Sequence, residues 1–426
     1  MSQRKIGLLL VNGPLPPPYG GVATYLAHML PFLAARGFEV HTIIDRPPAD
    51  PKHYRIFQEA GIHVYYAEAS RLKKIGQILK RVRLWVSTLL SSHISPFALL
   101  SALKSISSWI GIAEWIVRDH SIEIIHAYDY PWAQGFVAAY LGKKYKKRFV
   151  QTIFGEVVPH RNELVHHDAF GDRFKNLVRG VLEQSDLLLS VSKHCAREVS
   201  HVGMNPDRVK VTYYGIDVNR FSPDIDTSAL RLEYNLGGKR VVLFQGQVRS
   251  RKGPHVLLEA APLILKRVPN AVFLIVGPDF GIAEPLQQRA DQLNLGSTFL
   301  LLGPKPDDML PSFFAACDVF VFPSCTAIEC LGLTSIQAMA CGKPVVGSNI
   351  NGVPEVVVDG STGFLVEPGN PEALADKVSL LLEDGDLRSR MGAAGRQRAI
   401  QHFDRERLAQ ELLDLYNDLA LPRATT

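Results

Sequence analysis

The chain has 426 residues, and at roughly 100–200 residues per domain this length indicates two or three domains. Hydrophobic residues make up 46% and charged residues 21%, which excludes a mainly disordered, collagenous or coiled-coil protein. The charge is uneven, because residues 1–220 carry 28 Lys and Arg against 18 Asp and Glu, whereas the rest carries 19 against 24. The positive first half favours an anionic partner, such as an acidic lipid or a phosphate-bearing ligand.

The five cysteines show no repeated pair spacing. An odd number without a disulfide framework indicates reduced thiols in a cytosolic protein, and the spacing is not that of a cysteine zinc site. The apolar run at residues 6–11 is too short for a signal peptide, and no stretch reaches the 18 or so uncharged apolar residues of a spanning helix. We therefore expect a cytoplasmic protein without a transmembrane helix.

One segment without acidic residues, between Glu68 and Glu114, is basic and has a helical pattern. Its apolar residues recur at spacings of three and four, as in an amphipathic helix: Leu72, Ile75, Leu79, Val82, Val86 and Leu89. Basic residues lie mostly off this stripe and Trp85 lies near it, a combination found in helices at a membrane interface. The alternative is that the stripe packs on the domain's own sheet while the charges are solvated. Contact with an anionic membrane, at its inner face, is thus one of two expectations.

Short apolar strands alternate with longer helical patterns through the first half, which predicts a parallel α/β sheet. The helix predicted over residues 21–36 ends at Gly37, a residue suited to a helix C-terminus. The predicted strands of this half are residues 5–11, 39–44, 63–66, 123–127, 148–154, 187–190 and 209–213.

The alternation restarts after residues 217–238, a segment that mixes Pro, Asp, Ser and Gly, and the domain junction is placed there. We expect an N-terminal domain over residues 1–218 and a second domain over 219–405, with 406–426 forming a C-terminal helix that packs back on the first. The fold class is α/β, with two Rossmann-like domains, which usually bind a ligand in the cleft between the carboxyl ends of their sheets. The predicted strands of the second domain are residues 240–245, 271–276, 298–302, 319–322, 344–347 and 363–366.

Two glycine-containing loops follow predicted strands. The loop at residues 13–22 leads into a helix whose free N–H groups suit a phosphate, although a strand-to-helix turn needs glycine in any case. The loop at residues 244–253 contains Arg249, Arg251 and Lys252, cations that suit a departing diphosphate, with a solvated charge run as the alternative.

The most informative motif spans residues 322–346. A predicted strand leads to a loop with Glu329, and a helix begins at Gly332. The carboxylate can accept hydrogen bonds from sugar hydroxyls, and N–H groups from Gly332 to Thr334 can bind a phosphate. Gln337 lies farther along the same helix and can face the same ligand. For an isolated pattern, a glutamate that caps the helix would be the alternative.

Together these motifs resemble those of a known family. The chain is similar to retaining GT-B glycosyltransferases of the GT4 family, whose two Rossmann-like domains face each other across a deep cleft. The likeness extends from the Gly20-Gly21 loop through the Glu329 segment to residues 352–355 and 359–366, and its motifs are more specific in the second domain. It implies transfer of a hexosyl or N-acetylhexosaminyl group from a nucleotide-diphosphate sugar to a glycan, lipid-linked or polysaccharide acceptor, with no other cofactor.

The resemblance also assigns roles to individual residues. Glu329 matches a glutamate that holds the donor sugar, and Lys252 matches a lysine that neutralises the diphosphate together with an arginine. The catalytic candidates are Glu329, Lys252, Arg249, Arg251 and His126. The donor-binding candidates are Gly20, Gly21, Gln247, Gly303, Pro304, Lys305, Gly332, Leu333, Thr334 and Gln337. The acceptor-side candidates are Tyr128, Glu156 and His160.

At three positions the chain departs from the family pattern. The family's second glutamate, which holds the ribose, is Gln337 here, and an amide can still bind a diol. The expected arginine is Gln247, with Arg249 or Arg251 as a substitute. A histidine near the reacting sugar is replaced by Tyr128. These departures affect the expected turnover rate more than the expected fold.

The implied reaction proceeds on one face of the sugar, and the departing diphosphate assists deprotonation of the acceptor. The protein then mainly positions the reactants and stabilises the leaving group, so no metal is required. The Asp-x-Asp sequences at residues 224–226 and 384–386 fall in predicted linker or loop segments. A catalytically impaired subunit or scaffold that binds nucleotide sugar is an alternative motivated by the three departures. A nucleic-acid partner is not expected, because the basic clusters lack a recognition motif.

Overall fold

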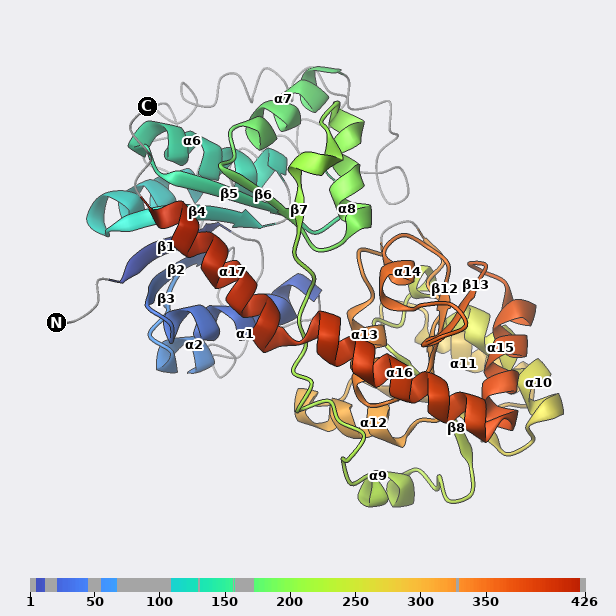
Figure 1. The fold of residues 1–426 in the computed structure, drawn as a ribbon. Helices are drawn as coiled ribbons and strands as arrows, with labels where there is room; N and C mark the ends of the chain where they lie inside the picture. Colours follow the sequence, from blue (N-terminus) through green and yellow to red (C-terminus); the bar gives the residue numbers. More distant parts are fainter. Residues whose placement is uncertain are drawn as a thin grey trace. The chain divides into compact units, whose positions relative to one another are not determined.

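The computed structural model describes residues 5–11, 21–44, 55–66, 109–128, 131–155, 157, 172–326 and 329–421. The chain forms two compact units (Figure 1): the first combines Met1–Thr212 with Ala409–Thr426, and the second comprises Tyr213–Leu408. The sequence placed these junctions after residues 218 and 405, a few residues away from the structural ones.

A seven-stranded parallel sheet forms the centre of the first unit, in the order β3-β2-β1-β4-β5-β6-β7. Its strands are β1 (Ile6–Val11), β2 (Phe38–Ile44), β3 (His63–Tyr66), β4 (Ile122–Tyr128), β5 (Arg148–Ile153), β6 (Leu187–Ser190) and β7 (Lys210–Val211). β1 is apolar throughout and buried from Gly7 onward, as expected for a strand with both faces covered. The strand predicted over 209–213 is present only as the short β7, because the chain leaves the sheet there to enter the second unit.

The helices of the first unit include one that comes from the far end of the chain. Its helices are α1 (Gly21–Ala34), α2 (Arg55–Glu59), residues 109–119, η2 (Pro131–Gly135), α6 (Phe136–Tyr145), α7 (Asp172–Glu183), α8 (Lys193–Arg197), η4 (Glu198–Val202), η5 (Pro206–Arg208) and most of α17 (Arg405–Ala420). Tyr416 of α17 is fully buried, packs its ring 5.6 Å from that of Phe38, and hydrogen-bonds His126 Nδ1 on β4. Arg148 Nε also donates to the Leu419 carbonyl at 3.0 Å. These contacts fasten α17 to the first sheet.

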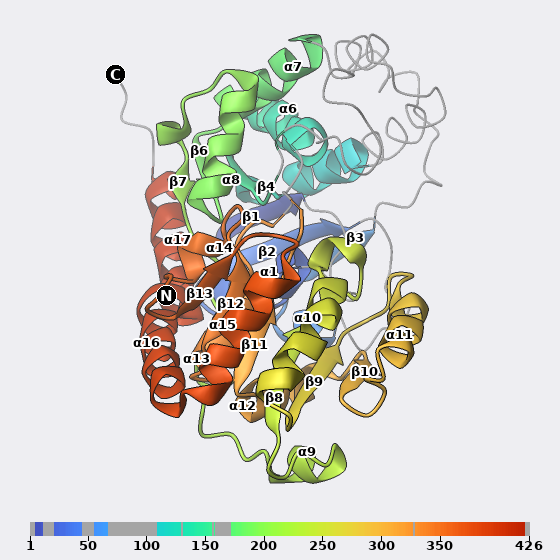
Figure 2. The same cartoon turned by 90° about the vertical axis from the view of Figure 1, so that its right-hand side faces the viewer.

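The second unit repeats the parallel α/β plan with a six-stranded sheet in the order β10-β9-β8-β11-β12-β13. Its strands are β8 (Arg240–Gln245), β9 (Ala271–Val276), β10 (Phe299–Gly303), β11 (Val319–Phe322), β12 (Val345–Ser348) and β13 (Gly363–Val366). Its helices are α9 (Ser228–Glu233), η6 (Ser250–Lys252), α10 (Pro254–Arg267), α11 (Ala283–Gln292), η7 (Asp307–Met309), α12 (Leu310–Ala316), α13 (Leu333–Ala340), α14 (Val353–Val356), α15 (Pro371–Glu383) and α16 (Gly385–Phe403). α10 and α15 pack side by side on one face, and α16 packs against α13 on the other (Figure 2).

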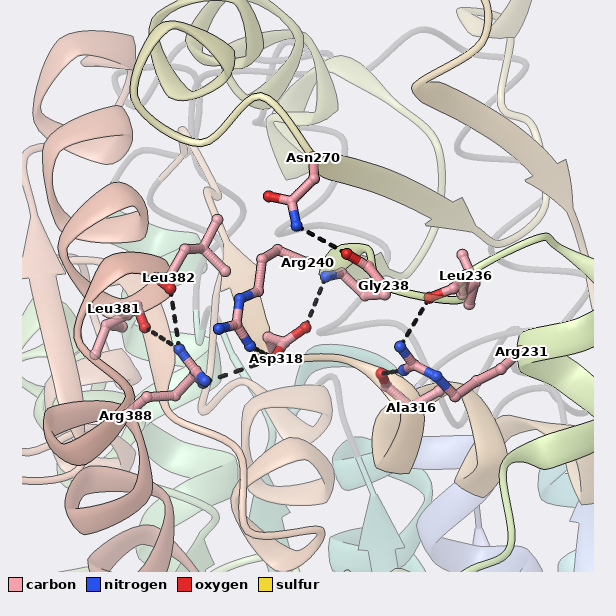
Figure 3. Close-up of polar contacts among 11 residues, drawn as sticks. Arg231, Leu236, Gly238, Arg240, Asn270, Ala316, Asp318, Leu381, Leu382 and Arg388 are labelled. Carbon is pink, nitrogen blue, oxygen red and sulfur yellow. Dashed lines mark hydrogen bonds and ion pairs between the residues drawn. The ribbon is translucent and has the colours of Figure 1, made fainter.

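A polar network holds the amino ends of β8 and β11 together (Figure 3). Asp318, directly before β11, accepts a hydrogen bond from Val241 N at 2.8 Å and lies 3.4 Å from Arg240 Nη1 and 3.6 Å from Arg388 Nε. Arg388 in turn donates to the carbonyls of Leu381 and Leu382 at the end of α15. The network therefore fixes the relative position of two central strands at the edge opposite their carboxyl ends.

The sequence also led to expectations about membrane-spanning helices and about the cysteines. None of the helices in the described parts is both long and apolar enough to cross a membrane. All five cysteines are free thiols, and burial raises the pKa of Cys317 and Cys341 to about 12. These two thiols are therefore protonated and unreactive at neutral pH.

Candidate active site

The strand order of the second sheet reverses at β8 and β11, which are neighbours although β9 and β10 lie between them in the sequence. In open parallel sheets, ligands bind beyond the carboxyl ends of the strands at such a reversal. The loop after β8 carries Lys252, and the loop after β11 carries Glu329. The two residues singled out from the sequence thus follow the two strands that define this point.

Lys252 and Glu329 are in direct contact. The ammonium Nζ lies 2.6 Å from Glu329 Oε1 and donates to Oε2 at 2.9 Å. The Glu329 side chain is 6% exposed and that of Lys252 is 21% exposed, so the pair is largely shielded but open on one side. A ligand that has both an anionic group and hydroxyls can bind the two halves of such a pair at once.

Ser324 completes this arrangement, although the sequence did not point to it as a site residue. Its hydroxyl lies 2.7 Å from Glu329 Oε1 and 3.0 Å from the Arg251 carbonyl, so it can orient the carboxylate. Its sequence signal is its place two residues after a buried strand. A serine there is common for reasons of turn formation, which is why it could not be distinguished.

The loops after β8 and β11 are joined by their backbones. Cys325 N donates to the Arg251 carbonyl at 2.9 Å, and Gly253, with φ +73°, packs directly on the Pro323 carbonyl. A Cβ atom at Gly253 would lie 1.8 Å from that oxygen. Only glycine therefore allows the backbone approach that places Lys252 next to Glu329.

We expect Gly253→Ala to lower the free energy of unfolding by about 2–4 kcal/mol, because it adds a steric clash to a left-handed backbone. Gly369→Ala is a matched control, since Gly369 has nearly the same φ of +75° but nothing within 4 Å of a Cβ. Urea unfolding of both variants measures the difference. Equal losses in the two variants would show that the loops are not in tight contact.

Helix α13 begins at Leu333, shortly after Glu329. Gly332 is its N-cap, in a left-handed conformation and without a side-chain cap. The first N–H groups of a helix have no partner within the helix and carry a partial positive charge, which suits a phosphate. Gly332, Leu333 and Thr334, for which the sequence predicts phosphate binding, thus lie at the amino end of α13.

Buried polar atoms without a hydrogen-bond partner among the described residues gather at the same edge of the second sheet. One ends β8, others follow β8, β11 and β12 or lie in the first turn of α13, and they are Gln245 Oε1, Arg251 Nε, Thr326 Oγ1, Thr334 Oγ1, Ser335 Oγ and Asn351 Nδ2. Such atoms are costly unless something satisfies them, so they mark a place for a polar ligand.

The other donor-side candidates of the second unit lie nearby in sequence or along the same sheet edge. Gln337 lies on α13 and is partly exposed, and Gly303 ends β10 and accepts a hydrogen bond from Gly277 N at 3.0 Å. Lys305 lies over the ring of Tyr234, and Arg249 over that of Phe280, each at 5.6 Å from the centroid. Pro304 is exposed and Gln247 is partly exposed.

The contacts described for these candidates are thus with other residues, whereas Ser324 contacts the Lys252–Glu329 pair directly.

In the first unit, His126 and Tyr128 lie on β4 and are buried. Both ring nitrogens of His126 are engaged, Nδ1 with Tyr416 and Nε2 with Thr152 Oγ1 at 2.7 Å, and burial holds its pKa well below the usual value. This favours a structural role for His126, which joins β4 to α17. Burial of Tyr128 raises the pKa of its hydroxyl, so this side chain is uncharged as well. Gly21 is the first residue of α1, whereas Gly20, Glu156 and His160 lie outside the described residues.

The two Asp-x-Asp sequences have local structural roles. Asp226 Oδ1 accepts from Ser228 N at 2.9 Å, and Asp384 caps α16 by accepting from Leu387 N at 2.8 Å. Both carboxylates thus stabilise the start of a helix.

Two families of known proteins match this chain. The profile of the glycosyl transferases group 1 family matches residues 228–398, and that of glycosyltransferase family 4 matches residues 19–220. The chain is a glycosyltransferase of the GT4 family. Its fold, with two parallel-sheet Rossmann-like units, is that of the GT-B glycosyltransferases.

Two relatives of this GT4 glycosyltransferase have names that specify phosphoinositol compounds. A D-inositol 3-phosphate glycosyltransferase of Corynebacterium urealyticum is 29% identical over 74% of this chain and 76% of its own length. A GDP-mannose-dependent phosphatidylinositol monomannoside mannosyltransferase of Mycolicibacterium smegmatis is 36% identical over 44% of this chain and 51% of its own length. The aligned part thus spans about half of the second relative.

Solved structures support the fold. The Anabaena protein HepE, determined with UDP, has a TM-score of 0.75 at 21% identity, with coverage of 97% of this chain and 100% of that one. Sucrose-phosphate synthase from Thermosynechococcus elongatus has the same TM-score at 22% identity, with coverage of 97% and 99%.

Proposed function

We propose that this glycosyltransferase is a retaining enzyme that moves a hexosyl or N-acetylhexosaminyl group from a nucleotide-diphosphate sugar to a glycan, lipid-linked or polysaccharide acceptor. The observation that carries the proposal is the Lys252–Glu329 pair beyond the carboxyl ends of β8 and β11. The likeness of the motifs to those of retaining GT4 enzymes supports the stereochemical part.

Each group of the site has a chemical task in this proposal. The Glu329 carboxylate, oriented by Ser324, accepts hydrogen bonds from the donor sugar's hydroxyls. The Lys252 ammonium and the amino end of α13 stabilise the negative charge that develops on the departing diphosphate. The diphosphate oxygen takes the acceptor's proton, so the protein supplies no general base and needs no catalytic metal.

The acceptor is proposed to be a phosphate-bearing lipid or lipid-linked glycan at the cytoplasmic face of a membrane. The names of the two relatives, which specify inositol 3-phosphate and a phosphatidylinositol mannoside, support a phosphate-bearing acceptor. The positive charge of residues 1–220 also supports it, but Lys144 is paired with Glu114 and Arg148 with Asp186, which reduces the free charge of the run at 143–148. The basic segment over residues 72–89 lies outside the described residues.

The test is direct observation of the reaction. A thermal-shift screen of nucleoside diphosphates and their sugars with the full chain identifies the donor, and NMR of the first sugar anomer released by donor hydrolysis gives the stereochemistry. Two results support the proposal: retention of configuration, and a turnover rate that EDTA leaves unchanged at a temperature where the protein is folded. Inversion would overturn the retaining mechanism, and tight nucleotide binding without turnover would favour a binding subunit or scaffold.

Gln337→Glu is expected to tighten nucleotide binding about tenfold, because a carboxylate forms stronger hydrogen bonds to the two ribose hydroxyls than a neutral amide does. Isothermal titration with the nucleoside diphosphate measures the change. Gln410→Glu, on the exposed surface of α17, is a control that should leave the affinity unchanged. No change on Gln337→Glu would mean that residue 337 does not face the ribose.

A further inference from the structure

Three histidines and a glutamate gather at the first sheet, away from the residues discussed so far. Glu39 and His41 lie two residues apart on β2 and therefore share a face, and His63, the first residue of β3, pairs in register with His41. His120, just before β4, packs its ring 4.4 Å from that of His41.

The polar atoms of these side chains converge on one carboxylate oxygen. Glu39 Oε1 lies 3.2 Å from His41 Nε2, 3.9 Å from His63 Nε2 and 3.8 Å from His120 Nδ1. The ligand atoms of Glu39, His41 and His63 all lie within 4.8 Å of one another. Metal bonds of about 2.0–2.2 Å in a tetrahedron place ligand atoms roughly 3.3 Å apart, so a small contraction of the cluster would enclose a Zn²⁺ ion.

The surroundings of His41 resemble the support that metal-binding histidines have. Its other ring nitrogen, Nδ1, lies 3.0 Å from the Tyr65 hydroxyl, which can accept a hydrogen bond from Nδ1–H and so leave the Nε2 lone pair for a metal. His41 is fully buried, whereas His63 is 49% and Glu39 36% exposed, so an ion can enter from solvent. Trp115 covers Tyr65 and His120 with edge-on ring contacts.

We propose that this cluster binds a divalent transition metal ion, with Zn²⁺ as the natural occupant, through Glu39, His41 and His63, and with His120 as the fourth ligand. Imidazole and carboxylate groups together suit Zn²⁺ and its neighbours in the periodic table. The proposal is independent of the transferase mechanism, because Glu39 and His63 lie near the amino ends of their strands, away from the sheet edge at which ligands bind. The ion would join the edge strand β3 to β2 and to the segment before β4, and so stabilise the first unit.

The experiment uses the full chain with any affinity tag removed, stripped of metal by chelation and dialysis. Titration with Zn²⁺, followed by calorimetry and by elemental analysis after dialysis, is expected to give one tightly bound ion and a rise in Tm. His63→Ala and Glu39→Gln replace partly exposed ligands, so these variants should fold, and each should weaken binding at least 100-fold. His201→Ala is the matched control: His201 is 47% exposed, close to the 49% of His63, and lies 3.3 Å from Glu198.

Two further measurements separate a metal site from adsorption to surface histidines. Tyr65→Phe, which removes only the hydroxyl beside His41 Nδ1, should weaken Zn²⁺ binding about 10–100-fold. Co²⁺ in place of Zn²⁺ should give the intense visible absorption of a tetrahedral complex in the parent protein and in His201→Ala, but not in His63→Ala. The absence of stoichiometric binding, or equal binding by His63→Ala, Glu39→Gln and the control, would overturn the proposal.

Discussion

Glu329→Gln is expected to reduce sugar transfer by about 10²–10³-fold, while the variant stays folded. The amide keeps the size of the side chain, but it loses the negative charge that binds hydroxyl hydrogens and that holds Lys252 in place. Hydrogen bonds to a charged group contribute about 1.5–3 kcal/mol each, and loss of one or two of them at a positioned substrate corresponds to this factor. The measurement is steady-state release of nucleoside diphosphate from the nucleotide sugar.

Glu259→Gln provides the control for this variant. Glu259 forms an ion pair of 2.7 Å with Arg289 on the surface of the same unit, so its replacement removes a carboxylate without touching the candidate site. Surface ion pairs contribute little to stability, so this variant should stay folded. Its turnover should then remain within about twofold of that of the parent enzyme. Near-parental turnover of Glu329→Gln would show that Glu329 does not bind the donor sugar.

Lys252→Ala is expected to reduce turnover by a similar factor, about 10²–10³-fold, because the charge on the departing diphosphate then lacks its nearest cation. It should also lower the free energy of unfolding, since Glu329 is left as a buried carboxylate whose remaining partner among the described residues is Ser324. For fully buried pairs this cost is about 3–5 kcal/mol, and the partial exposure of Lys252 places it at or below the lower limit.

The two effects can be separated with a second substitution. In the double variant Lys252→Ala with Glu329→Gln, no unpaired charge is left, so most of the lost stability should return while turnover stays low. Arg289→Ala is the control for removal of a surface cation. Full activity of Lys252→Ala, measured with saturating donor, would show that the diphosphate is neutralised elsewhere.

Most of the fold could be predicted from the sequence. The strands are short apolar runs bounded by Gly, Pro and polar residues, and each predicted strand is present, with small shifts at the ends. The burial of β1 and β8 follows directly from their apolar composition. The Lys252–Glu329 contact could also be predicted, because both residues follow strands whose carboxyl ends lie at one edge of the sheet.

The remaining features depend on contacts between segments far apart in sequence. The histidine cluster joins residues 39, 41, 63 and 120 through the pairing of β2 with β3, and no local spacing among them suggests a common site. His126, a catalytic candidate from the sequence, is held in the core by Tyr416, which lies 290 positions away in the chain. Short motifs carry information about turns and helix ends, whereas these contacts arise only from the complete topology.

The return of α17 to the first unit has a consequence for synthesis of the protein. Tyr416 fills the space beside Phe38 and His126, yet it leaves the ribosome after the entire second unit. Because domains form largely in the order in which they are made, this part of the first unit's core stays uncovered until α17 has been synthesised. A nascent chain that stalls after residue 408 would therefore expose apolar surface to chaperones and proteases even though its second unit could already be complete.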